Sequence, residues 1–137
     1  MKVKDLMTRS ICCVSPDMTL ENAAKLMSDA DVGAVPVCGS DGLVGIVTDR
    51  DIVTRAISKG YAFDTPVEKI MTRDVVSVGA DYDIADAVKI MGGRQIRRLP
   101  VLSGREIVGI LSVGDLARCG KLDAEVAEAE SGIAEEL

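Results

Sequence analysis

Apolar residues in the first third of the chain recur with the spacing of an amphipathic helix. Between residues 20 and 30 they occupy positions i, i+3, i+4 and i+7, which places them on one helix face. Thr19 precedes this run and is a predicted N-cap. Earlier, residues 11–14 form a short β-rich run that Pro16 ends, because proline cannot donate a backbone hydrogen bond to a sheet. The pattern therefore predicts a strand followed by a helix.

A hairpin and a second helix are predicted next. Residues 34–37 and 43–48 are β-rich, and a Ser-Asp-Gly turn at 40–42 separates them. The helix is predicted from residue 49 to Gly60, which ends it because glycine readily adopts positive φ. Its expected buried stripe consists of Ile52, Val53, Ala56 and Ile57.

The same pattern returns later in the chain without a gap. The Met-Thr-Arg at residues 7–9 recurs at 71–73, an offset of 64, and the Val-Gly-Ile at 44–46 recurs at 108–110. The second copy therefore predicts a strand at 75–78, a helix at 84–91, strands at 99–102 and 107–112 around a turn at 103–105, and a helix at 113–119.

The repeat predicts the organisation of the chain. Repeat 1 covers residues 1–60, a linker covers 61–66, repeat 2 covers 67–120, and an acidic tail covers 121–137. Each repeat has too little apolar area to be stable alone, so the two are expected to bury their faces against each other. The predicted fold class is α/β (α+β), a pseudo-twofold pair of β-α-β-β-α repeats with two equivalent clefts.

Composition and charge argue against several functions. Aromatic residues make up 2% and the net charge is −6, which disfavour stacking on single strands and binding to phosphate backbones. The chain has no apolar run long enough to span a membrane and no signal-peptide core, so we expect a cytoplasmic protein without membrane association. Residues 121–137 hold six acidic residues and one lysine, with an apolar stripe that predicts a short helix or a disordered segment.

The residues for metal or catalytic chemistry are missing. The chain contains no histidine, and its four cysteines, at 12, 13, 38 and 119, include no C-x-x-C pair. We expect these cysteines to be buried thiols. A nucleophile elbow and a glycine-rich phosphate loop are also absent, so we expect no enzyme, no metal site and no required cofactor.

One short motif occurs in both repeats and carries candidate binding chemistry. Thr48 is followed three residues later by Asp51, and Ser112 by Asp115, each time at the end of a predicted strand. An ionised carboxylate accepts hydrogen bonds and donates none, so it suits the vicinal hydroxyls of a ribose. The same residues also suit a helix N-cap and first turn. The pattern leaves both interpretations open.

Together, the Met-Thr, Pro-Val and Gly-Ile-Val-Thr-Asp-Arg-Asp segments resemble the cystathionine-β-synthase (CBS) domain, and two in tandem resemble a Bateman module without an attached effector domain. The resemblance covers about residues 3–117. It implies a pseudo-symmetric pair with two clefts, an adenosine-containing ligand, and a disc-like homodimer through the helices of the CBS pair. AMP, ADP or ATP is expected, ahead of S-adenosylmethionine or NAD.

The resemblance also implies which residues would bind this ligand. Asp51 and Asp115 would contact the ribose, with Thr48 and Ser112 beside the ribose or phosphate. The expected walls around the base are Ile11, Cys12, Cys13, Gly33 and Ala34 for the site of Asp115, and Val75, Val76, Ser77 and Ile96 for the site of Asp51, with Ile46 and Ile110 as further apolar walls.

The repeats differ just before their Pro-Val segments, where the second copy carries Arg97 and Arg98. These arginines would contact phosphates, or would be solvated arginines at a strand edge. We therefore expect two sites of unequal affinity, with that of Asp51 preferred.

Two functional hypotheses remain. The chain is either a sensor that binds an adenosine-type small molecule and signals to an unknown effector protein, or a dimerisation and protein-interaction module that binds no ligand.

Overall fold

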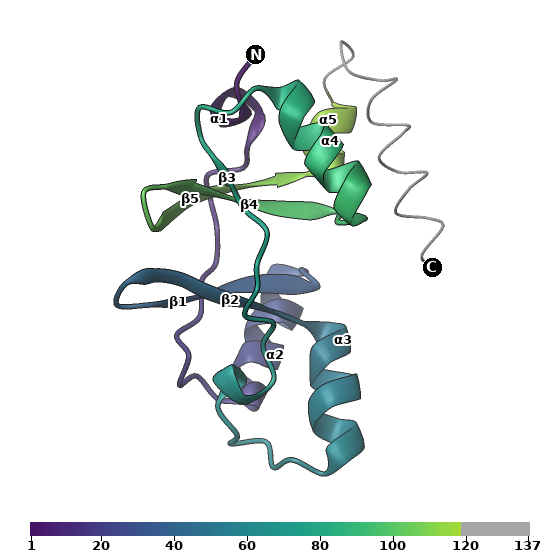
Figure 1. Cartoon of the computed structure of the whole chain (residues 1–137). Helices are drawn as coiled ribbons and strands as arrows, with labels where there is room; N and C mark the ends of the chain where they lie inside the picture. The colour runs from purple at the N-terminus through teal and green to yellow at the C-terminus, as the bar shows by residue number, and fades with distance from the viewer. Residues whose placement is uncertain (119–137) are drawn as a thin grey trace. The chain divides into compact units, whose positions relative to one another are not determined.

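The computed structural model describes residues 1–118 and divides the chain into two compact units (Figure 1). Unit 1 combines Met1–Ile11 with the described part of Val76–Leu137, and unit 2 is Cys12–Val75. Both are mixtures of helices and strands, as the predicted α+β fold class requires. The predicted tail lies outside the described residues.

Unit 2 contains the first predicted helix and the hairpin. Its elements are α2 (Leu20–Ala30), β1 (Ala34–Gly39), β2 (Gly42–Thr48), α3 (Asp49–Asp51), the π-helical turn η1 (Ile52–Ala56), and the 3-10 turns η2 (Ile57–Lys59) and η3 (Val67–Lys69). The Thr19 side chain accepts a hydrogen bond from the Asn22 N–H, which confirms the predicted N-cap. Strands β1 and β2 pair antiparallel, and Gly60 ends the second helical run at φ 76°. These elements are as predicted.

The buried stripe of the second helix is narrower than predicted. Ala56 is buried and Ile52 is partly buried, but Val53 and Ile57 are 60% and 49% exposed. The cause is the π turn: the Ile57 N–H donates to the Ile52 carbonyl five residues earlier, so the helix advances more residues per turn than the pattern assumed. Side chains expected on the core face are therefore rotated into solvent.

Unit 1 is built around a three-stranded sheet. Its elements are α1 (Val3–Leu6), β3 (Val78–Gly79), α4 (Ile84–Arg94), β4 (Arg98–Ser103), β5 (Glu106–Ser112) and α5 (Val113–Ala117). The strand order is β3-β4-β5, with the first pair parallel and the second antiparallel. The buried face of α4 packs into a core of Val, Leu, Ile and Met side chains. The predicted helix, hairpin and final helix of repeat 2 are confirmed up to residue 118.

The first strand of each repeat is shorter than predicted. Residues 11–13 form no strand, and Val14 makes a single parallel bridge with Val37. On the other side of Val14, Pro16 has no backbone N–H to donate and does not extend the pairing. In repeat 2 only Val78–Gly79 pairs with β4, and the Val75 N–H instead donates to the Arg73 carbonyl in a local turn.

The compact units do not follow the repeat boundaries at residues 60 and 67. Residues 1–11 belong to the unit built from repeat 2, and residues 67–75 to the unit built from repeat 1. The predicted linker 61–66 also belongs to unit 2, where the Thr65 and Phe63 carbonyls accept hydrogen bonds from the first turn of α2. The sequence repeats and the folding units are therefore different divisions of the same chain.

The repeated Met-Thr segment attaches each of these stretches, 1–11 and 67–75, to the unit built from the other repeat. Thr8 pairs with Ile110 of β5 through two backbone hydrogen bonds of 2.9 and 3.0 Å. Thr72 pairs in the same way with Ile46 of β2, with both bonds at 2.9 Å. In each unit, the Met-Thr segment of the other sequence repeat thus pairs with the second strand of the hairpin.

The glycine of each Gly-Ile motif makes this pairing possible. A Cβ on Gly45 would lie 2.7 Å from the Met71 sulfur, and a Cβ on Gly109 would lie 2.6 Å from the Met7 sulfur. Either distance is far below van der Waals contact, so a side chain at these positions would push the Met-Thr segment off the sheet. The two glycines are therefore required by the close approach of this segment.

Candidate functional site

The first copy of the candidate motif lies where β2 runs into α3. The Thr48 hydroxyl accepts a hydrogen bond from the Asp51 N–H at 3.0 Å, and Asp51 Oδ2 accepts one from the Thr48 N–H at 3.0 Å. This reciprocal pair is a capping box, which satisfies backbone donors at the start of the helix. The Asp51 side chain retains 14% exposure. The carboxylate is thus held in place by one oxygen while the residue remains accessible.

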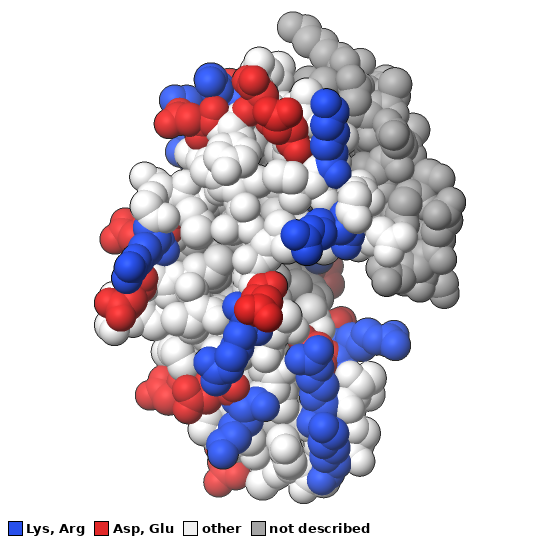
Figure 2. Space-filling view, in the orientation of Figure 1, with Lys and Arg blue, Asp and Glu red and all other residues white. Residues whose placement is uncertain are grey.

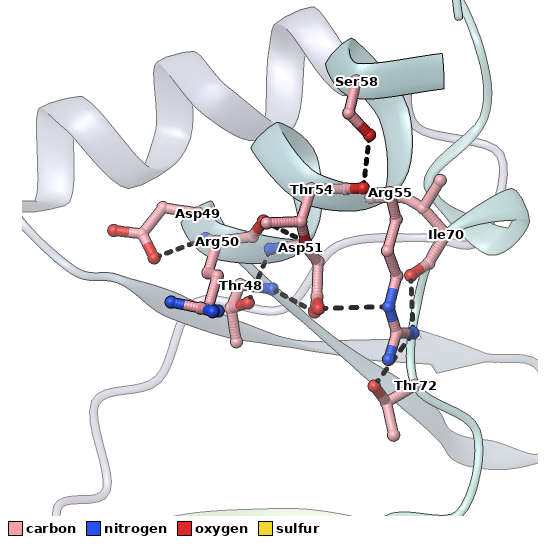
Figure 3. A network of polar contacts seen from close by, with 9 residues as sticks. All are labelled: Thr48, Asp49, Arg50, Asp51, Thr54, Arg55, Ser58, Ile70 and Thr72. Carbon is pink, nitrogen blue, oxygen red and sulfur yellow. Dashed lines mark hydrogen bonds and ion pairs between the residues drawn. The ribbon is translucent and has the colours of Figure 1, made fainter. Parts of the chain in front are cut away.

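Arg55 links this carboxylate to the segment that completes the sheet (Figure 3). Its Nε lies 3.6 Å from Asp51 Oδ1, and its guanidinium donates to the Ile70 carbonyl at 3.3 Å and to the Thr72 hydroxyl at 3.4 Å. The ion pair is long and half of the Arg55 side chain is exposed, at 49%. Asp51 Oδ1 is therefore only loosely engaged.

The second copy has the same capping box at the junction of β5 and α5. Asp115 Oδ2 accepts from the Ser112 N–H at 2.9 Å, and the Ser112 hydroxyl accepts from the Asp115 N–H at 3.0 Å. The backbone conformations of the two caps agree closely, with φ/ψ of −117°/161° at Thr48 and −112°/160° at Ser112. The duplicated sequence therefore produces duplicated geometry.

The surroundings of Asp115 differ from those of Asp51. The Thr8 hydroxyl donates to Asp115 Oδ1 at 3.1 Å and also lies 3.4 Å from Oδ2, and the Arg118 guanidinium forms a close ion pair with Oδ1. The Asp115 side chain is only 3% exposed. Both of its oxygens are therefore occupied by groups of the protein.

The arginines that pair with the two carboxylates lie at different spacings from their aspartates. Arg55 follows its aspartate by four residues, whereas Arg118 follows by three. At the repeat offset, Arg118 corresponds to Thr54 and not to Arg55. The two arginines are therefore unrelated by the duplication, and sequence comparison of the repeats did not single them out. The comparison of the repeats also did not identify Thr8 as a partner of Asp115. The repeated Met-Thr segment was the sequence feature that could have pointed to it.

The two predicted phosphate-binding arginines are exposed at the start of β4. Arg98 pairs with Ser112 across the hairpin, and the Arg97 carbonyl accepts a hydrogen bond from the Val113 N–H at 3.0 Å. In repeat 1 the same backbone bond joins the Gly33 carbonyl to the Asp49 N–H, also at 3.0 Å. Arg97 and Arg98 are thus placed next to the Ser112 cap within unit 1. Figure 2 shows basic side chains interspersed with acidic ones on the face in view.

The predicted wall residues are distributed over both units. Ile11 belongs to the unit of Asp115, and Val75 to the unit of Asp51, but each predicted set also contains residues of the other unit. None of the wall residues is fully buried: Cys12 and Cys13 are exposed and the rest are intermediate. The assignment of these residues to one ligand or another stays a prediction.

The cysteines are less buried than predicted. Cys12 and Cys13 are exposed and Cys38 is half-buried, and all three are free thiols. Val14 next to them takes the core position at 1% exposure, and Cys12 and Cys13 lie in a segment that forms no strand. Cys119 lies outside the described residues. Among residues 1–118, no group of three or more His, Cys, Asp or Glu side chains is placed to hold a metal ion.

Together, the fold and the paired caps define a protein of two α+β units that each carry a hydroxyl–carboxylate motif at a strand-to-helix junction. A sequence profile of the CBS domain matches residues 3–58 and 67–121. The chain therefore belongs to the CBS domain family and contains two copies of the domain.

Individual relatives support this assignment. The chain is 43% identical over 115 residues to the CBS domain-containing protein YhcV of Bacillus subtilis, covering 84% of this chain and 82% of that protein. It is 38% identical over 117 residues to hypoxic response protein 1 of Mycobacterium tuberculosis, with coverage of 84% and 82%.

Solved structures agree. The crystal structure of Hypoxic Response Protein I with two coordinated zinc ions matches with a TM-score of 0.79 and 35% identity, covering 87% of this chain and 98% of that one. The CBS domain pair of MJ0100, in complex with 5′-methylthioadenosine and S-adenosyl-L-methionine, matches with a TM-score of 0.75 and 27% identity, covering 86% and 94%. Within the described part of this chain, no helix is both long and apolar enough to cross a lipid bilayer.

Proposed function

We propose that this protein is a regulatory module that binds an adenosine-containing nucleotide, AMP, ADP or ATP, through its two hydroxyl–carboxylate motifs. The observation that carries the proposal is the duplicated cap, in which each aspartate is oriented by the backbone at a strand-to-helix junction. A carboxylate held in this way can accept both hydroxyls of a ribose. The ligands named for the MJ0100 domain pair contain the same adenosine group.

The two motifs are proposed to differ in affinity. Asp51 Oδ1 has one long contact of 3.6 Å to Arg55, so a ribose hydroxyl can donate to it with little rearrangement. Asp115 already accepts from Ser112, Thr8 and Arg118, so a ribose must displace at least one of them. The site of Asp51 is therefore the first to fill, and the site of Asp115 fills at higher ligand concentration.

The phosphates are proposed to be bound by Arg97 and Arg98. Both side chains are exposed, and within residues 94–98 they form a concentration of positive charge with Arg94. Their guanidinium groups can each donate two parallel hydrogen bonds to a phosphate. Arg97→Ala should therefore weaken binding of a nucleotide more than binding of adenosine.

A thermal-shift titration with AMP, ADP, ATP, adenosine, S-adenosylmethionine and NAD tests the proposal. A ligand at a hundred times its dissociation constant adds about 2.7 kcal/mol to the free energy of unfolding, which raises Tm by several degrees. An unchanged Tm with every compound at millimolar concentration contradicts nucleotide binding.

Asp51→Asn is the variant that assigns the site. Asparagine still caps a helix, so folding is preserved, but its amide offers only one oxygen to the ribose. Asp49→Asn is the matched control, because Asp49 lies in the same turn and its side chain accepts a local hydrogen bond from the Arg50 N–H. The assignment requires that Asp51→Asn weakens binding and that Asp49→Asn does not.

A second candidate function is dimerisation, and a specific surface of unit 2 supports it. An apolar groove of about 370 Å³ lies between α2 and the second helical run, lined by Leu20, Ala24, Ile52, Ile57 and Phe63 with a few polar residues. Two of the lining side chains are largely in solvent, Phe63 at 64% and Ile57 at 49% exposure. We propose that a second copy of the chain covers this groove.

Light scattering on the wild type and on Ile57→Glu tests the homodimer. A charged side chain in the groove should convert a dimer into a monomer. Lys59→Glu, an exposed change on the same helical run outside the lining residues, should leave the dimer intact. A wild type that is monomeric at high concentration rules the dimer out.

A further inference from the structure

Arg55 lies between the Asp51 carboxylate and the second Met-Thr segment of the chain (Figure 3). Its Nε is 3.6 Å from Asp51 Oδ1, and its Nη1 donates to the Ile70 carbonyl at 3.3 Å and to the Thr72 hydroxyl at 3.4 Å. Both nitrogens belong to one planar guanidinium, so a movement that changes one of these contacts changes the others. The orientation of Arg55 therefore depends on the carboxylate and on residues 70–72 at the same time.

The segment that Arg55 contacts is attached to the sheet by a single bridge. Thr72 and Ile46 of β2 exchange two backbone hydrogen bonds of 2.9 Å, and no longer strand is formed there. Ile70 and Met71, just before the bridge, are 3% and 7% exposed. Shortly after it the chain leaves unit 2, which ends at Val75. An isolated bridge has few neighbouring bonds to support it, so its opening responds to small changes in side-chain contacts.

Unit 1 contains the same connection with different chemistry. There the Thr8 hydroxyl donates directly to Asp115 Oδ1 at 3.1 Å, while the Thr8 backbone pairs with Ile110 of β5. At the repeat offset, the residue that corresponds to Arg55 is Cys119, so repeat 2 has no arginine at this position. Each candidate carboxylate is thus connected, directly or through one arginine, to the Met-Thr segment of the other sequence repeat.

We propose that Arg55 is a positioning residue of the Asp51 site, and that it couples this carboxylate to the attachment of residues 70–72 on β2. The Arg55 side chain is 49% exposed, and its ion pair with Asp51 restrains it in the orientation that reaches Ile70 and Thr72. Loss of the Asp51 charge removes this restraint, because a long exposed side chain otherwise samples many rotamers. The bonds to the segment are then formed for less of the time, and the bridge at Thr72 opens more often.

The consequence for ligand binding rests on the proposed function. A ribose hydroxyl that donates to Asp51 Oδ1 competes with Arg55 Nε for the same oxygen, and a 3.6 Å contact is readily replaced by a shorter hydrogen bond. Occupancy of the site therefore loosens Thr72 in the same direction as loss of the charge. Because the chain continues from Thr72 through Val75 into unit 1, ligand binding alters the segment that connects the two units.

Amide hydrogen exchange measured by NMR tests the coupling without any ligand. The reporters are the Thr72 and Ile46 amides, which donate to each other's carbonyls, whereas the amides between β1 and β2 report unfolding of the whole unit. Asp51→Asn removes the charge and keeps a residue that caps helices. It should accelerate exchange of the two reporters relative to the hairpin amides by about two- to fivefold, the range for an exposed ion pair.

A double-mutant cycle separates this coupling from general destabilisation. Arg55→Met alone should accelerate the two reporter amides, and in its background Asp51→Asn should have no further effect, because the connection is already lost. Arg55→Lys keeps the charge but offers one nitrogen in place of the fork, and it provides the same cycle if Arg55→Met folds poorly. Arg50→Met is the matched control and should change neither reporter, since only the Arg50 backbone bonds within this turn.

The proposal is overturned if Asp51→Asn leaves the reporters unchanged, accelerates the hairpin amides equally, or has the same effect with and without Arg55. Saturating ATP then separates it from the proposed function. ATP that raises Tm should accelerate the reporters relative to the hairpin in the wild type and not in Arg55→Met, and equal behaviour of the two proteins overturns the coupling. If ATP does not bind, the proposed function fails, and the ligand-free cycle decides whether Arg55 couples Asp51 to Thr72.

Discussion

The Thr8 hydroxyl donates a hydrogen bond to the Asp115 carboxylate at 3.1 Å, although 107 residues separate them along the chain. It thereby joins the N-terminal segment to the candidate site of repeat 2. The corresponding hydroxyl of Thr72 bonds to Arg55 and not to Asp51. Together with the closer arginine contact of Asp115, this difference makes the two carboxylates chemically unequal.

Replacement of Thr8 by valine should destabilise the protein more than the same change at Thr72. The Thr8 bond has a charged and buried acceptor, and loss of such a bond costs about 1.5 kcal/mol or more. The Thr72 hydroxyl accepts a hydrogen bond from the half-exposed guanidinium of Arg55 at 3.4 Å. Urea unfolding of Thr8→Val and Thr72→Val measures the difference. Equal midpoints would show that the bond to Asp115 adds no more to stability than the bond of Thr72 to Arg55 does.

Alanine at Gly45 or Gly109 should destabilise the fold by about 1–3 kcal/mol, because the new methyl group overlaps a methionine sulfur and a threonine carbonyl. Gly93 in α4 is the matched control, since a Cβ there meets nothing within 4 Å. Gly93→Ala should raise stability by up to about 1 kcal/mol through better helix propensity. Thermal unfolding of the three variants distinguishes the close approach from a general effect of glycine removal.

Removal of the Arg118 side chain should strengthen nucleotide binding at the second site. In an Asp51→Asn background, Arg118→Ala frees Asp115 Oδ1 for a ribose hydroxyl. The Arg118 side chain is 72% exposed, so its ion pair contributes at most about 1 kcal/mol, equivalent to about fivefold in affinity. Isothermal titration with ATP measures the change. Weaker binding in the double variant would show that Arg118 contacts the ligand itself.

The exposed Lys4–Asp81 ion pair should be visible in an NMR titration. The pair is 3.0 Å long and lowers the pKa of Asp81, through a hydrogen bond from Lys4 and then its charge. A depressed carboxyl pKa gives stability that is present above the unfolded pKa and is lost as pH falls through the folded value. Lys4→Met should raise the Asp81 pKa back toward its ordinary value, whereas Lys89→Met should not. An unchanged titration in Lys4→Met would contradict the pair.

Cys38 should be the slowest of the three described cysteines to react with iodoacetamide at pH 8. Its pKa of about 12 leaves little thiolate, and its side chain is half-buried. Burial is the largest cause of this raised pKa, so Cys13→Ser should accelerate alkylation of Cys38 only slightly. Mass spectrometry of timed samples gives the rates. A Cys38 that reacts as fast as Cys12 would contradict the raised pKa of the Cys38 thiol.

Helices, caps and turns could be predicted from the sequence because they depend on residues that are close together in the chain. The helical spacing over residues 20–30, the cap at Thr19 and the turn between the β-rich runs all act within a few residues, and the structure confirms them. The gapless repeat predicted two copies of one domain, and the CBS family match confirms this. The capping interpretation of Asp51 and Asp115 was also available from spacing alone, whereas their role in ligand binding stays a prediction.

Only the tertiary structure decided how the copies are completed and which groups surround each carboxylate. The Met-Thr segment at residues 7–8 pairs with β5, about a hundred residues away, and no local pattern specifies a partner at that distance. The π turn moved Val53 and Ile57 into solvent because hydrogen-bond spacing within a helix depends on packing as well as periodicity. The duplicated sequence thus made the two caps alike, whereas long-range contacts left the Asp115 side chain more enclosed, at 3% exposure, than the Asp51 side chain, at 14%.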